Sequence, residues 1–128
     1  MKLSSEKSEW IQALVSEMTL EEKAGQMTQL TLEALSSSPQ TNDGQLVLYT
    51  TRMKEAFGEK HIGSVLNVFA QSMSKEEWRN CISTLQEQAL SNSRLDIPML
   101  YGIDAVHGAN YTTDGTLFPQ NINLGATW

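Results

Sequence analysis

Hydrophobic residues recur at intervals of three and four in two stretches of the chain, which is the spacing that one face of an α-helix requires. In the first stretch this face consists of Trp10, Leu14, Val15 and Met18. In the second it consists of Trp78, Ile82, Leu85 and Ala89. We therefore expect two amphipathic helices, the second running to about Asn92.

Two segments also carry the signature of a capping box, in which a hydroxyl side chain and a carboxylate three residues later satisfy free backbone N–H groups at a helix start. The pairs are Thr19 with Glu22 and Ser74 with Glu77. The first pair predicts a further helix that begins at Leu20. The second pair predicts where the helix around Leu85 begins.

Short, nearly continuous apolar runs predict strands. These runs are Leu46–Tyr49, Ile62–Phe69 and Met99–Ile103. Met27–Leu32 fits either a strand or a continuation of the helix before it. The polar turn formers from Ser36 to Gly44 predict a surface loop, and Arg52–Phe57 predicts a short helix that stops at Gly58.

Apolar strands that alternate with amphipathic helices indicate an α/β fold with a parallel sheet. The run Met99–Ile103 leaves little room for polar side chains on either face, so we expect this strand to be buried. A doubly wound sheet and a barrel both fit. A nucleotide-binding sheet would show an early glycine-rich turn between strand and helix, and the sequence has none, so the barrel is favoured.

Composition narrows the classes of partner. The 128 residues include 15 acidic and 9 basic side chains, a balance that argues against nucleic acid. No stretch approaches the ~20 apolar residues of a membrane span, and residues 1–9 lack the apolar run of a secretory leader. We expect neither nucleic acid nor a membrane as partner. The cellular compartment is not determined, because a sequence that had lost a secretory leader would show the same residues.

The candidate metal and nucleophilic side chains are few. Cys81 is the only cysteine and lies within a helical pattern, so we expect it in the core. His61, just before a predicted strand, is expected to be a solvent or packing residue. A catalytic zinc site usually has three protein ligands, and Asp104 with His107 supplies two. We expect no metal and no cofactor.

Asp104 is the main candidate for a functional side chain. It directly follows the predicted strand Met99–Ile103, and ligands of parallel α/β folds bind at the carboxyl ends of strands. Its position fits a functional carboxylate or one that caps the next turn. His107 fits a site shared with Asp104 or a buried histidine bonded to backbone. Nearby glycines allow sharp turns or close approach to a ligand: Gly102, Gly108 and Gly115.

Four motifs in register resemble the amino-terminal part of glycoside hydrolase family 3. They are Met18–Met27 (MTLEEKAGQM), Ile62–Asn67 (IGSVLN), Gly102–Gly108 (GIDAVHG) and Thr116–Asn121 (TLFPQN). The form of the third motif resembles the β-glucosidase and exo-glucanase branch. At Asn67–Ala70 the chain departs from the many members that carry a glycine-rich turn approaching the sugar.

The resemblance implies a first domain of (β/α)8-barrel type, irregular in the early strands of some members, followed by an α/β sandwich domain. A complete barrel takes about 250 residues, so we expect residues 1–128 to supply only the amino-terminal portion of an incomplete barrel domain. The remainder of the barrel and the second domain are then absent from this chain.

The resemblance also implies a retaining, exo-acting β-glucosidase that removes terminal β-glucosyl residues from a β-glucoside or oligosaccharide. Family members place the aspartate nucleophile late in the barrel domain and the glutamate acid/base usually in the second domain. No catalytic residue is therefore assigned here, and the chain alone is expected to be inactive. Nothing in the resemblance gives Asp114, the nearest other acid, a catalytic role.

Asp104 matches the family aspartate that binds sugar hydroxyls in the subsite before the cleaved bond. A carboxylate suits that role because it accepts charge-assisted hydrogen bonds from two neighbouring hydroxyls. Two alternatives remain beside the hydrolase. One is a non-catalytic sugar-binding or interaction fragment that uses Asp104, and the other is a partial barrel whose open edge and apolar faces make it associate.

Overall fold

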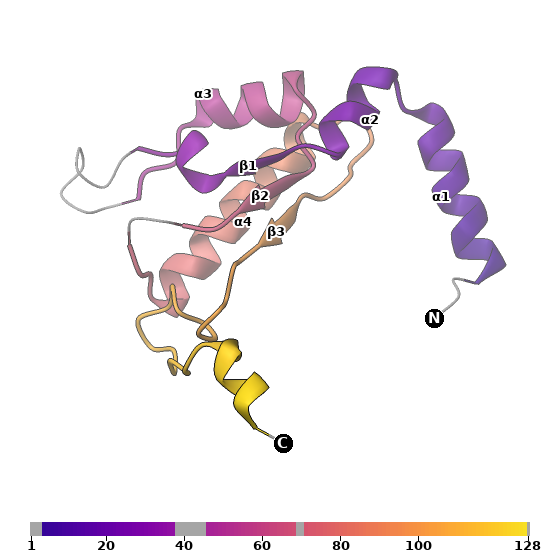
Figure 1. Ribbon diagram of the computed structural model, residues 1–128. Helices are drawn as coiled ribbons and strands as arrows, with labels where there is room; N and C mark the ends of the chain where they lie inside the picture. The colour runs from indigo at the N-terminus through magenta and orange to yellow at the C-terminus, as the bar shows by residue number, and fades with distance from the viewer. Residues whose placement is uncertain (1–3, 38–45, 69–70, 128) are drawn as a thin grey trace.

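The chain adopts an α/β arrangement in which helices cover one side of a small parallel sheet (Figure 1). The computed structural model describes residues 4–37, 46–68 and 71–127. The helical segments are α1 (Ser5–Glu17), α2 (Leu20–Gln26), η1 (Leu32–Ala34), α3 (Thr50–Met53), η3 (Lys54–Glu59), α4 (Lys75–Asn92) and η4 (Asn121–Ala126). The strands are β1 (Gln29–Thr31), β2 (Ser64–Leu66) and β3 (Leu100–Gly102).

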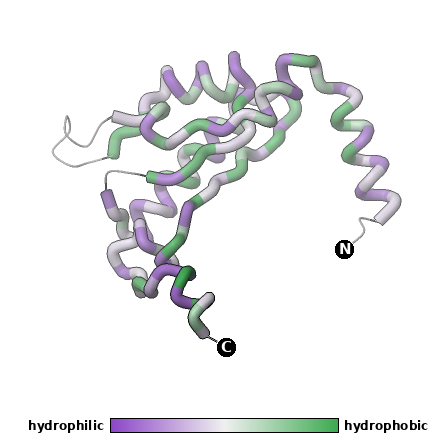
Figure 2. Tube along the Cα trace, viewed as in Figure 1, coloured by the Kyte–Doolittle hydropathy of each residue, from purple (hydrophilic) through white to green (hydrophobic). Residues whose placement is uncertain are grey.

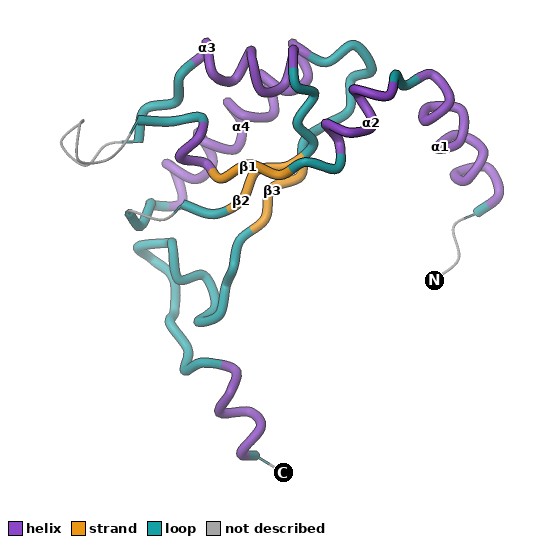
Figure 3. Tube along the Cα trace, turned by 45° about the horizontal axis from the view of Figure 1, so that its top comes forward, coloured by secondary structure: helices purple, strands orange, loops and turns teal. Residues whose placement is uncertain are grey.

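The three strands pair in chain order β1-β2-β3, and both pairings are parallel. In Figure 3 they lie side by side, with α3 and α4 on one side of them. The central register row consists of Leu30, Val65 and Tyr101. This pairing confirms the predicted α/β class, and it resolves Met27–Leu32, where the chain forms a strand rather than a longer helix.

The hydrophobic core lies between the sheet and α4. Val65 and Leu85 are each fully buried, and Cys81 and Ala89 line the same face of α4. The Trp78 ring meets Tyr101 edge to face with 5.7 Å between ring centroids, and the Gln86 amide donates to the Met99 carbonyl. These contacts fasten α4 along β3. Of the predicted apolar face, Leu85 and Ala89 are buried and Trp78 and Ile82 are half-buried.

The other face of the sheet is open. Side chains alternate between faces along a strand, so the rows on either side of Leu30, Val65 and Tyr101 point away from the core. On this face Gln29 and Thr31 are exposed, and Leu100 is 74% exposed. The prediction that the strand ending at Ile103 is buried on both faces is therefore wrong, because one face of β3 is left uncovered.

Both capping boxes form as predicted. Thr19 and Ser74 each accept from the backbone N–H three residues later, and Glu22 and Glu77 reach back to the cap residue. The helix around Leu85 ends at Asn92, as its periodicity indicates.

The first helix forms, but its apolar face does not pack within the chain. α1 has no buried residue, and Trp10 is 66% exposed. Figures 1 and 2 show the helix extending away from the sheet, with apolar positions along it. Periodicity predicts the helix correctly because it reports an apolar stripe, whereas burial depends on what lies opposite that stripe.

Two other expectations are wrong. Leu46–Tyr49 is not a strand, since Leu48 forms only an isolated antiparallel bridge with Ser36. Ser36 and Ser37 are buried and tied to this segment, so the start of the predicted Ser36–Gly44 surface loop is internal, and residues 38–44 lie outside the described part.

The short helix in the middle of the chain also differs from its prediction. α3 continues into the wider turns of η3, which contains Gly58 and ends at Glu59. The chain reverses at His61, whose φ of 55° lies in the left-handed region. The stop at Gly58 was therefore predicted too early.

A close backbone crossing sets β1 against β2. The Gly63 N–H donates to the Gly25 carbonyl at 3.0 Å, and the Gly63 carbonyl accepts from Leu100 N. A Cβ at Gly25 would collide with the Lys60 carbonyl, and one at Gly63 would collide with the Gln26 carbonyl. Glycine is required at both positions because any side chain would push the two segments apart.

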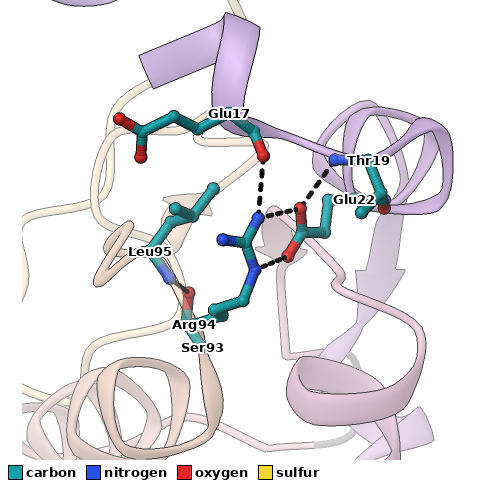
Figure 4. A network of polar contacts seen from close by, with 6 residues as sticks. All are labelled: Glu17, Thr19, Glu22, Ser93, Arg94 and Leu95. Atoms are coloured by element: carbon teal, nitrogen blue, oxygen red, sulfur yellow. Dashed lines mark hydrogen bonds and ion pairs between the residues drawn. The ribbon is translucent and has the colours of Figure 1, made fainter. Parts of the chain in front are cut away.

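An ion pair locks the helical start of the chain onto the segment after α4 (Figure 4). Arg94 donates from Nε and Nη2 to the two Glu22 oxygens at 3.0 and 2.8 Å, and Nη2 also donates to the Glu17 carbonyl. Glu22 is 7% exposed. Hydrogen bonds from Arg94, then from the Thr19 backbone, lower the pKa of Glu22 from 4.5 to about 2.

No helix within the described ranges is long and apolar enough to cross a bilayer.

Truncation of Leu85 to alanine tests the core. Because this side chain is fully buried, we expect Leu85→Ala to lower the free energy of unfolding by about 2–5 kcal/mol. Leu90→Ala, on the same helix at 40% exposure, is the matched control and is expected to cost less than about 1 kcal/mol. Urea unfolding followed by circular dichroism measures both, and equal losses would contradict the packing.

Acid weakens the Glu22–Arg94 lock. Since folding lowers the pKa of Glu22 from 4.5 to about 2, its stabilisation is complete above about pH 5 and disappears as the pH falls toward 2. We expect Glu22→Gln to melt at a lower temperature than the unmodified chain at pH 7, with the two midpoints converging near pH 2. Glu76→Gln, which removes an exposed carboxylate from α4, is the control. A difference in melting temperature between Glu22→Gln and the unmodified chain that does not change with pH would contradict this interpretation.

Candidate functional site

The carboxyl ends of β2 and β3 bring two polar residues together. Leu66 and Gly102 are paired in register, Asn67 follows the first directly, and Asp104 lies two residues beyond the second. This is the edge of a parallel sheet at which α/β proteins bind ligands. The candidate site is built on this edge.

Asn67 and Asp104 hold each other by two hydrogen bonds. The Asn67 Nδ2 donates to Asp104 Oδ2 at 2.9 Å, and the Asp104 backbone N–H donates to Asn67 Oδ1 at 2.7 Å. Both groups of the side-chain amide are therefore used on one partner. Hydrogen bonds to an ionised oxygen are the stronger kind, so this contact fixes the orientation of the carboxylate.

The backbone of Asn67 is fixed from β3 as well. Its N–H donates to the Gly102 carbonyl at 2.9 Å, and its carbonyl accepts from the Tyr101 hydroxyl at 2.8 Å. Burial raises the pKa of that hydroxyl, which therefore stays protonated and donates. Asn67 is 1% exposed and has a φ of 53°, a left-handed conformation that asparagine tolerates better than most residues.

Asp104 itself is exposed. The sequence predicts a carboxylate delivered by a strand buried on both faces, and the structure corrects this because β3 has one open face. Oδ2 accepts from Asn67, and within the described residues no other group bonds the carboxylate. Oδ1 is therefore an acceptor that hydroxyl groups of a ligand can reach.

His107 is bonded to backbone and does not bond Asp104. Its Nδ1 lies 2.9 Å from the Phe118 carbonyl oxygen, and the Phe118 N–H donates to the His107 carbonyl. The residue is half-buried, so the backbone bond considered for His107 forms while its expected burial is only partial. Gly108 follows with a φ of 80°, and the turn it makes brings the backbone close to the Phe118 ring.

The remaining candidates lie apart from this pair. Asp114 is exposed, and His61 is half-buried at the turn before β2. Cys81 is 4% exposed in the core, where burial raises the pKa of its thiol to about 11. The prediction of a core cysteine is confirmed. Across the described ranges, no three histidine, cysteine, aspartate or glutamate side chains are grouped so as to hold a metal ion.

The loop after Asp104 borders a cavity of about 470 Å³ that it shares with the start of η4. Its lining includes Ala105, Gly108, Phe118, Asn121 and Leu124. An aromatic ring, aliphatic groups and amide side chains thus lie beside the site.

Asn67 is the site residue that sequence reasoning missed. It ends the motif Ile62–Asn67, but the sequence alone gives it no role in a site. The available signal was its position, because it follows the second strand as Asp104 follows the third, and both strand ends lie on the same sheet edge.

Residues 19–128 match the family model of the glycosyl hydrolase family 3 N terminal domain. A lysosomal beta glucosidase of Dictyostelium discoideum is 36% identical over 135 aligned positions that cover 97% of this chain and 16% of that protein.

Two solved structures are similar. The exo-1,3/1,4-beta-glucanase of a Pseudoalteromonas species superposes with a TM-score of 0.71 and 27% identity, over 98% of this chain and 15% of that one. The beta-glucosidase of Listeria innocua, in complex with glucose, gives a TM-score of 0.51 and 30% identity, over 78% of this chain and 13% of that one.

The chain thus spans 16% of the length of the curated relative. The family model covers residues 19–128, which include both the capping box at Thr19 and the site at Asp104. On this match the chain belongs to glycosyl hydrolase family 3.

Proposed function

We propose that this chain contributes the glucose subsite of a retaining, exo-acting β-glucosidase, and that Asp104 binds sugar hydroxyls there. The observation that carries the proposal is an exposed, oriented carboxylate at the carboxyl edge of a parallel sheet. The chain is similar to beta-glucosidases, and one of these has been solved with glucose and with laminaribiose. This similarity supports a β-glucoside as the ligand.

Asp104 is proposed to position the sugar and not to attack it. Two neighbouring hydroxyls of a pyranose can donate to one carboxylate. The two hydrogen bonds together fix the orientation of the sugar ring. Retaining hydrolysis needs two carboxyl groups about 5–5.5 Å apart, one nucleophile and one acid/base. Here the hydrogen-bonding partner of Asp104 is a neutral amide. We assign both catalytic carboxylates to other parts of the enzyme.

The sheet is proposed to be the first part of a (β/α)8 barrel domain, to which residues 1–128 contribute. Three strands that are parallel and adjacent in chain order are what the start of such a barrel requires. The likeness to the exo-glucanase over 98% of the chain supports the same view. The open face of the sheet would then be directed toward the inside of the barrel.

Removal of the Asp104 carboxylate tests the subsite. We expect the chain to bind glucose weakly and Asp104→Ala to weaken binding at least tenfold, since each hydrogen bond to a charged group contributes about 1.5–3 kcal/mol. Asp114→Ala removes another exposed aspartate in the same loop region and is expected to bind as the unmodified chain does. Glucose titration to molar concentration, followed by tryptophan fluorescence and ¹⁵N NMR, measures all three. Unchanged affinity in Asp104→Ala would sink the assignment.

Turnover distinguishes an enzyme subsite from an active enzyme. We expect the purified chain to release no aryl alcohol from an aryl β-glucoside, because the proposed nucleophile and acid/base lie elsewhere. Hydrolysis that Asp104→Ala abolishes would contradict this. Reading the coding sequence after codon 128 completes the test: unrelated sequence behind a stop codon would favour a non-catalytic sugar-binding protein over a hydrolase.

A further inference from the structure

Among the described residues, the side chain of Asn67 forms both of its hydrogen bonds with Asp104. Its Nδ2 donates to the carboxylate and its Oδ1 accepts from the backbone N–H of the same residue. An asparagine that served only to cap the end of β2 would gain as much from local backbone partners. Instead both bonds reach across 37 positions of the sequence.

The amide provides orientation without charge. A lysine or arginine in its place would form an ion pair and neutralise the carboxylate toward a ligand. A neutral donor holds Oδ2 without placing a positive charge beside the carboxylate, which can then accept hydrogen bonds from hydroxyl groups. The other oxygen, Oδ1, is left to the ligand.

The support behind Asn67 is rigid. The residue is 1% exposed, its φ is 53°, and Gly102 and Tyr101 hold its N–H and carbonyl from the neighbouring strand. A side chain held in this way has few conformations available. The fixed direction of its amide therefore fixes the orientation of the carboxylate that is hydrogen-bonded to it. Groups held in this way by surrounding packing bind ligands at lower entropic cost.

We infer that Asn67 is a positioning residue that sets the orientation of the Asp104 carboxylate for binding sugar hydroxyls, an inference that rests on the proposed glucose subsite. It touches no ligand in this role and acts through Asp104 alone.

The first test uses the unmodified chain and NMR. On titration with glucose, the side-chain amide signals of Asn67 are expected to shift with the same saturation curve as the backbone signals around Asp104. The amide of Asn80, exposed on α4, serves as the internal control and is expected to stay in place. Glucose-induced shifts around Asp104 with none at the Asn67 amide would overturn the inference.

The second test removes the amide while keeping the backbone. Asn67→Gly retains access to the left-handed conformation and is expected to weaken glucose binding at least tenfold. Asn67→Asp keeps the size and the acceptor but replaces the donor by a carboxylate oxygen, and is expected to weaken binding as well. Asn80→Ala and Asn80→Asp make the matching changes on α4 and are expected to bind like the unmodified chain. Circular dichroism verifies that each variant is folded at the temperature of measurement.

The outcomes separate the two proposals. Loss of binding in Asp104→Ala together with full binding in Asn67→Gly or Asn67→Asp overturns the positioning role and leaves the glucose subsite intact. Full binding in Asp104→Ala, or no binding by the unmodified chain, overturns the subsite and the positioning role together. If both Asn67 variants fail to fold, the NMR response of the unmodified chain decides.

Discussion

The backbone contact between Gly25 and Gly63 is the constraint on which the rest of the structure depends. Gly63 donates to the end of α2 through Gly25 and accepts from the start of β3 through Leu100. One residue thus connects three segments that are far apart in the sequence. Since no side chain fits at either glycine, the register of β1 and β3 against β2 follows from this crossing.

The opposite end of the same strands carries the candidate site. Because the strands are parallel, a register set near Gly63 also determines which residues meet after Leu66 and Gly102. Asn67 and Asp104 meet there, joined by two hydrogen bonds of 2.9 and 2.7 Å. The amino ends of the strands therefore serve stability and their carboxyl ends serve the proposed sugar site, the division of labour that parallel α/β folds commonly show.

The Glu22–Arg94 pair links local and tertiary structure in one side chain. Glu22 completes the capping box of α2, a bond that the sequence reveals through its spacing from Thr19. The same carboxylate receives Arg94, 72 positions further along the chain, and that hydrogen bond is the largest cause of its lowered pKa. The helix start is therefore fixed to the segment that leads into β3.

The sequence by itself determined what depends on near neighbours. The capping boxes at Thr19 and Ser74 need a partner only three residues away. Helical periodicity likewise predicts the burial of Cys81 and Leu85. The motifs around Gly25, Gly63 and Asp104 suffice to show the family, although they give no reason for the glycines. That reason is steric and appears only when the two segments cross.

Tertiary structure decided what depends on residues far away in the sequence or on the surfaces that cover a side chain. Leu100 and Trp10 occupy apolar patterns yet are exposed, because burial requires an element opposite them and this chain places none there within its described residues. Asn67 joins the candidate site only through partners 34 and 37 positions away and through a left-handed φ. No local pattern encodes such a contact, because sheet register is set by the packing of the whole chain.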